Sequence, residues 1–202
     1  MLKALELFKE NIKDAKNLTS LYEYLEVTIK SPFSFDDLLR SQIVYSVSAF
    51  DKLIHDVIRI GMVEIFTAKR QPTPKYEAES IPISTHIELL SATIPPKEYI
   101  FEQTVIKKLK VISFQEPEKV ADGLSYIWNE KQKWQKIAIR MGMDDKTVKT
   151  KLKLIADRRN IIVHESDFNP TTHKKYTISK SECQDITDFL CKCGESIVDF
   201  LI

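Results

Sequence analysis

Apolar residues recur at helical spacing along most of the chain, and the longest such pattern runs from residue 36 to about residue 66. Ser34 precedes Asp36 and Asp37, which supplies a helix N-cap and two acids for the first turn. The apolar positions that follow are Leu39, Ile43, Val47, Ile54, Ile58 and Ile65. Because this spacing places them on one helix face, we predict one long helix over 36–66.

Similar patterns predict further helices, separated by proline-marked loops. They cover residues 2–16, 20–30, 85–94, 97–113, 117–141, 144–166 and 180–202. Capping-box pairs mark two of the helix starts, Thr85 with Glu88 and Ser179 with Glu182, and Asp144 and Asp145 begin the helix over 144–166. Residues 67–82 contain three prolines and are predicted to form a loop. β-Branched residues between 105 and 112 leave a strand open as an alternative for part of 97–113.

Composition supports the same fold class. Four glycines in 202 residues argue against an all-β fold, which needs many tight turns. We therefore expect an all-α protein, an antiparallel helical bundle with long helices, in one domain over residues 1–202. No apolar run approaches the roughly 18 residues that span a bilayer, and the charged N-terminal segment lacks the pattern of a signal peptide. We expect no membrane contact and a cytoplasmic location. The odd number of cysteines (Cys183, Cys191 and Cys193) predicts reduced thiols that pack in the core, with no metal site.

Positive charge is concentrated in one region. Residues 131–159 contain ten Lys and Arg residues against three acids, although the net charge of the whole chain is only +1. Such asymmetry is typical of a surface that binds a polyanion. A solvated basic helix face without a ligand would give the same pattern.

Two charged residues fall inside the apolar faces of their predicted helices. Arg159 lies between the apolar positions of 144–166, with Asn160 and His164 on the adjoining flank. Asp51 occupies the equivalent place in 36–66, with His55 at its edge. Because an unpaired buried carboxylate is costly, Asp51 needs a partner, and Arg159 is the candidate. The pair could be purely structural, and His164 could be a helix-end histidine that bonds a carbonyl.

A family resemblance bears on that choice. The string Arg158-Arg159-Asn160-Ile161-Ile162-Val163-His164-Glu165 resembles the R-x4-6-H motif of HEPN proteins, in which Asn, Asp or His commonly follows the arginine. Residues 46–56, SVSAFDKLIHD, look like the corresponding early helix of the RiboL-PSP branch. Glu165 and Ser166 follow the histidine, so the H-x-Y extension of HEPN toxins paired with nucleotidyltransferase antitoxins is absent.

The resemblance implies a metal-independent endoribonuclease without a cofactor, working as a homodimer whose two motifs line one cleft. It implies catalytic roles for Arg159, Asn160 and His164, supported by Asp51 and His55. RNA would be held by basic residues of the charged region: Lys131, Lys133, Lys136, Arg140, Lys149, Lys153 and Arg158. It also implies a part in antiviral defence or a toxin-like stress response, with a neutralising or regulatory protein partner.

Two other functions compete with the nuclease. One is a non-catalytic HEPN module that binds RNA, a nucleotide or a protein partner. The other is a structural helical module for dimerisation, in which Asp51 and Arg159 form only a core ion pair. Trp128 and Trp134 could stack on bases, but core packing is the favoured interpretation for both.

Overall fold

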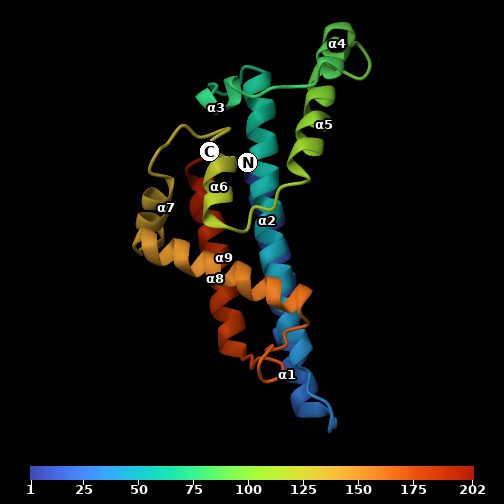
Figure 1. Cartoon of the computed structure of the whole chain (residues 1–202), viewed down its shortest axis with the longest axis vertical. Coiled ribbons are helices and arrows are strands. Elements are labelled where there is room, and N and C mark those ends of the chain that lie inside the picture. The colour runs from blue at the N-terminus through green and yellow to red at the C-terminus, as the bar shows by residue number, and fades with distance from the viewer.

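The computed structural model describes residues 1–202, and all of its regular structure is helical (Figure 1). The nine helices are α1 (Leu2–Thr28), α2 (Asp36–Phe66), α3 (Pro74–Glu77), α4 (Ile83–Ser91), α5 (Lys97–Leu109), α6 (Pro117–Leu124), α7 (Lys133–Met141), α8 (Asp145–His164) and α9 (Lys180–Asp199). The prediction of an all-α fold is confirmed, and the strand considered for part of 97–113 is wrong. None of the helices combines the length and the apolar character needed to cross a bilayer.

Helices α1, α2 and α9 form the centre of the molecule (Figure 1). Lys9 pairs with Glu195 at 2.8 Å and Lys16 with Asp188 at 2.6 Å, so α1 and α9 run antiparallel. The two helices approach closely at Gly194 of α9, where an added Cβ would lie 2.6 Å from the ring of Phe8. A side chain at this position would therefore push α1 and α9 apart.

The first helix is continuous, and the predicted break between residues 16 and 20 is wrong. Thr19 is buried, and its hydroxyl donates to the side-chain oxygen of Gln42 on α2. The Gln42 amide then donates to Thr187 of α9 at 3.1 Å, and Thr187 exchanges a 3.0 Å hydrogen bond with Ser46. Thr19, which lies in the predicted break, is thus part of a satisfied buried network that joins the three central helices.

The single helix predicted over 117–141 is also wrong, because the chain folds back between α6 and α7. Lys133 donates to Ser125 Oγ at 2.9 Å and to the Glu130 carbonyl, which closes the intervening loop. Trp134 is buried and donates from Nε1 to the Pro117 carbonyl at 3.0 Å, as the core interpretation of this residue requires. These bonds use side chains that periodicity alone assigned to one helix.

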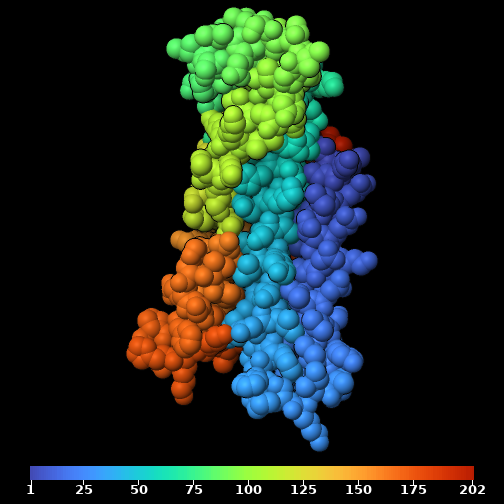
Figure 2. All heavy atoms as spheres, turned by 90° about the vertical axis from the view of Figure 1, so that its right-hand side faces the viewer, coloured from blue at the N-terminus to red at the C-terminus, as the bar shows by residue number.

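Helices α3 and α4 differ from prediction in detail. The predicted loop 67–82 contains α3, which Thr73 caps by accepting a hydrogen bond from the Tyr76 backbone N–H. Helix α4 begins at Ile83, so Thr85 lies inside its first turn and does not cap it. No residue of α4 is buried. Together with α5, it forms one end of the elongated molecule (Figure 2).

Helices α8 and α9 begin where predicted. Asp144 accepts a hydrogen bond from the Thr147 N–H, and Ser179 accepts one from the Glu182 N–H. The cysteines are free, and Cys183 and Cys193 are buried, where burial raises the pKa of each thiol to about 12. Helix α8 runs across α2 and α9 rather than along them, which departs from a simple antiparallel bundle (Figure 1). Its last turn therefore lies against α2.

Candidate functional site

Helix α8 carries Arg159 to a polar cavity on α2. The preceding apolar positions of its inner face are buried: Val148, Leu152, Ile155 and Ala156. Arg159 continues that face by one turn, where it lines a cavity of about 450 Å³. The other walls come from α2, α5 and the chain before α6: Ser48, Asp51, Lys52, His55, Asp56, Arg59, Ile106, Leu109, Lys110 and Gln115. We call this the Arg159 cavity.

The predicted ion pair between Asp51 and Arg159 does not form, although both residues line the cavity. Asp51 instead accepts a hydrogen bond from the Phe114 backbone N–H, and its carboxylate lies 3.8 Å from His55 Nε2. His55 packs edge-on against the Phe114 ring, with 4.7 Å between ring centroids. The partner that Asp51 required is thus a backbone donor, which periodicity cannot reveal.

The guanidinium of Arg159 has a hydrogen-bond donor without a partner. Its Nη1 donates to Asn160 Oδ1 at 3.1 Å, and its buried Nε has no hydrogen-bond partner. An unpaired buried donor is unusual, because leaving one unsatisfied costs about 1–3 kcal/mol. The Arg159 guanidinium is therefore suited to bind an anion within the cavity.

His164 is the last residue of α8 and is exposed, with no hydrogen bond to its imidazole. The alternative of a histidine that bonds a helix-end carbonyl is therefore wrong. Five positions separate it from Arg159, which turns the two side chains roughly 140° apart around the helix. Within one chain, His164 does not line the Arg159 cavity. The structure brings Arg159 together with Asn160, Asp51 and His55, but not with His164.

Arg158 has a different role from its neighbour. Its guanidinium binds both carboxylate oxygens of Asp167, which is fully buried and also accepts a 2.6 Å hydrogen bond from Arg40 Nε. The backbone N–H of Asp167 donates to the Ile161 carbonyl, which ties the loop to α8. We call Arg40, Arg158 and Asp167 the Asp167 clamp. The sequence pattern did not predict this cluster, in which the side chain of Arg158, predicted to bind RNA, is already engaged by Asp167.

The other basic residues predicted to bind RNA differ in exposure. Lys133 is only 7% exposed, and burial lowers its pKa, so its amine is largely withdrawn from the surface. Three of the remaining five form surface ion pairs: Lys136 with Glu130, Arg140 with Asp199, and Lys149 with Asp145. Such pairs are weak, about 0–1 kcal/mol, and leave the charges available to a ligand. Lys131 and Lys153 are exposed without a partner.

Four of the predicted residues share one flank of α8. At 100° per residue, Lys149, Lys153, Asn160 and His164 fall within an arc of roughly 60°. All four are at least partly exposed, and together they extend over about 22 Å of helix, at 1.5 Å per residue. The flank therefore presents two amines, an amide and an imidazole in a row, and we call it the basic flank of α8. No group of three or more His, Cys, Asp or Glu side chains is arranged to hold a metal ion.

Cavity residues that sequence analysis missed include Arg59, one helical turn beyond His55. The spacing of Asp51, His55 and Arg59 along α2 is a signal that could have found it, because each step of four keeps the same face. Lys110 and Gln115 come from other elements and give no such signal.

Comparison with known proteins identifies one family. The RiboL-PSP-HEPN family model matches residues 9–202, which is nearly the whole chain. No curated protein and no solved structure matches. The match extends over both α2, which carries Asp51 and His55, and the end of α8, which carries the arginine–histidine motif. The chain therefore belongs to the RiboL-PSP-HEPN family.

Proposed function

We propose that the protein is an endoribonuclease that cleaves RNA without a metal ion, by attack of a ribose 2′-hydroxyl on the adjacent phosphate. The family, the basic flank of α8 and the complete Arg159–Asn160–His164 set support this function. In the cell it would act in antiviral defence or a toxin-like stress response, under the control of a regulatory protein.

The contrast between Arg158 and Arg159 carries the proposal. The first arginine is engaged by a buried carboxylate, as a structural arginine should be. The second has a buried Nε without a partner and faces a polar cavity, and His164 is likewise free of intramolecular hydrogen bonds. The fold thus leaves the motif's cation and its titratable group available to a substrate.

The chemistry follows from these groups. RNA supplies the nucleophile, so the protein needs a base for the 2′-hydroxyl proton, an acid for the departing 5′-oxygen, and a cation for the charge on the phosphorane. The His164 imidazole accepts the 2′-hydroxyl proton and donates a proton to the departing 5′-oxygen, because an imidazole can act as both base and acid. Arg159 offers forked donors to the phosphate oxygens, and Asn160 orients the guanidinium that it already contacts. Asp51 and His55 shape the cavity wall. The products are a 2′,3′-cyclic phosphate and a 5′-hydroxyl.

A homodimer would complete the site. Because Arg159 and His164 point to different sides of α8, we propose that Arg159 of one subunit acts with His164 of the other in a composite cleft. Apolar side chains near His164 provide contact surface for a second copy: Tyr45 is 58% exposed, and Val163 and Phe168 are each 44% exposed. Tyr45 also lines a hollow with Ile162 of α8, which places it beside the motif.

The first test is RNA cleavage. Purified protein incubated with transfer RNA and EDTA should give fragments ending in 2′,3′-cyclic phosphate. Arg159→Ala and His164→Ala should each reduce cleavage at least about 100-fold, the lower range for loss of a donor to the developing charge and of an acid–base group respectively. His173→Ala, which alters an exposed loop histidine outside the motif, should cleave like the wild type. Wild-type rates in both motif variants would exclude the assignment.

The second test is complementation between inactive chains. Mixing Arg159→Ala with His164→Ala and allowing subunits to exchange should restore cleavage. In a mixed dimer, one of the two composite sites would have both an intact arginine and an intact histidine. If both residues acted from one chain, no mixed dimer would contain an intact site, and mixing would restore nothing.

One observation favours a second candidate, a non-catalytic module that binds an anion such as RNA or a nucleotide. The Arg159 cavity contains a guanidinium with an unpaired Nε, but His164 of the same chain does not line it. For such a module, Arg159→Ala would weaken RNA binding, whereas the wild-type protein would produce no cyclic-phosphate ends.

A further inference from the structure

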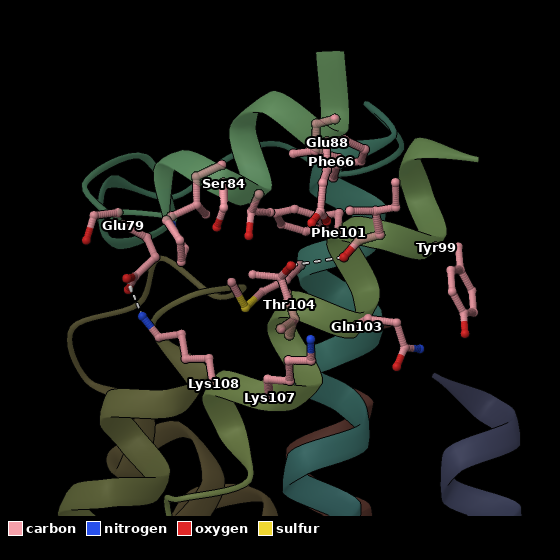
Figure 3. A pocket seen from close by; sticks show the side chains of 18 of the residues that line it. Phe66, Glu79, Ser84, Glu88, Tyr99, Phe101, Gln103, Thr104, Lys107 and Lys108 are labelled. Atoms are coloured by element: carbon pink, nitrogen blue, oxygen red, sulfur yellow. Dashed lines mark hydrogen bonds and ion pairs between the residues drawn. The ribbon is translucent and has the colours of Figure 1, made fainter. Parts of the chain in front are cut away.

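A large cavity lies at the end of the molecule formed by α4 and α5, away from the basic flank of α8 (Figure 1). It encloses about 1040 Å³ between α4, α5, the end of α2 and the segment that joins α3 to α4 (Figure 3). That volume is at the upper end of the range for small-molecule sites, roughly 300–1,000 Å³. None of the residues assigned to catalysis or RNA binding lines it.

Aromatic side chains form much of its apolar wall. Phe66 of α2 stacks on Phe101 of α5, with ring centroids 4.3 Å apart and planes inclined by 8°. Tyr76 meets Phe101 edge-on at 6.2 Å. Met62 and Leu89 add aliphatic surface. Such walls favour a ligand with a flat or bulky apolar body, and aromatic faces also attract organic cations.

The charged side chains that line the cavity determine whether it favours an anionic or a cationic ligand. Lys108 pairs with Glu79, which also accepts a 2.6 Å hydrogen bond from the Tyr126 hydroxyl, so this cation is neutralised within the wall (Figure 3). Burial opposes ionisation of Glu79, but the bonds from Lys108 and Tyr126 outweigh it and hold the pKa of Glu79 below its ordinary value.

Three charged lining residues remain without an ion-pair partner. They are Lys107 of α5, Glu77 of α3 and Glu88 of α4. Two free carboxylates against one free amine leave the lining with a net charge of −1. A negative lining beside aromatic faces disfavours anions and favours an ammonium group.

We propose that this cavity binds a small amphipathic amine, a molecule with an apolar body and one ammonium group. The apolar body lies against the Phe66–Phe101 wall, and the ammonium group faces the carboxylate of Glu88. The site is separate from the proposed nuclease site, so either proposal can fail without the other.

The test is calorimetric titration of the full chain with three probes that share one apolar body. They are 1-naphthylmethylamine, 1-naphthol and naphthalene-1-sulfonate. The amine should bind once per chain and tightest of the three. Glu88→Gln should weaken amine binding about tenfold, which corresponds to about 1.4 kcal/mol. Glu98→Gln, at an exposed acid of α5 outside the cavity, should bind the amine like the wild type.

Filling the cavity supplies an independent variant. Thr104→Trp and Leu89→Trp each place an indole in the space, and at least one of them should fold with wild-type helicity and lose amine binding. The proposal is overturned if the sulfonate binds as tightly as the amine, or if no probe binds at millimolar concentration. Unchanged amine binding in a folded tryptophan variant would overturn it as well.

Discussion

At the end of α8, the sequence predicts the position of one arginine but not the partner of the arginine next to it. The position of Arg159 on the inner face follows from helical periodicity, because Val148, Leu152 and Ile155 define that face. The position of Arg158 does not, because its partner Asp167 lies in a loop whose path depends on contacts distant in sequence. Asp167 has a positive φ of 62°, a conformation that no pattern of residues in this loop indicated.

The Asp167 clamp gives a prediction about stability. Asp167→Asn removes the charge that balances the guanidinium groups of Arg40 and Arg158, and breaking a buried ion pair from one side costs about 3–5 kcal/mol. Urea unfolding should show a loss of this size. Asp185→Asn, at an exposed acid of α9 without an ion-pair partner, should change the free energy of unfolding by less than about 0.5 kcal/mol. An unchanged midpoint in Asp167→Asn would mean that the clamp does not stabilise the fold.

At the scale of the element, local signals predicted the helices whose ends are set by their own side chains. The caps at Asp144 and Ser179 are examples. Elements were wrong where tertiary contacts overrode the local pattern. Thr19 forms a hydrogen bond across to α2 in the middle of α1, and Lys133 closes a loop in the middle of a predicted helix.

Close helix packing gives a second prediction. Gly194→Ala adds a methyl group that would lie 2.6 Å from Phe8 and 2.8 Å from Leu53, both of them buried. Overpacking costs about 1–3 kcal/mol, which exceeds the gain of up to about 1 kcal/mol in helix propensity. The thermal unfolding midpoint should therefore fall. The matched change Lys192→Ala on the exposed face of the same helix should leave it nearly constant, and an unchanged midpoint in Gly194→Ala would mean that α1 can move aside.

At the scale of the whole molecule, the sequence predicted the helical class and the family but not how α8 crosses the central helices. The buried face of α8 packs against α2 and α7, so its direction depends on contacts with elements distant in sequence. The direction of α8 determines which residues meet at the candidate site, because it places Arg159 against α2 and leaves His164 exposed at the end of the helix. Residues that meet across three elements, such as Lys110 and Gln115 in the Arg159 cavity, could not be assigned from periodicity.

The basic flank of α8 gives a third prediction, on salt dependence. RNA binding, measured in the His164→Ala background to prevent cleavage, should weaken as salt rises because counterions are released from phosphates. Lys153→Ala should lower the slope of log K against log salt by roughly 0.7–1, the value for one phosphate contact. Lys3→Ala, at an exposed position of α1, should leave the slope unchanged. Equal slopes in the two variants would remove Lys153 from the RNA-binding surface.

Helix α5 and the residue after it line both cavities. The larger cavity is lined by Lys107 and Lys108, and the Arg159 cavity by Ile106, Leu109 and Lys110. A single rigid helix cannot tilt on one side without reshaping the space on the other. A ligand that binds in one cavity and displaces α5 would therefore change the affinity of the other cavity for its own ligand. By thermodynamic linkage, the two effects on affinity are equal in size. If both proposed sites are occupied as inferred above, α5 would couple amine binding in one cavity to phosphate binding by Arg159 in the other.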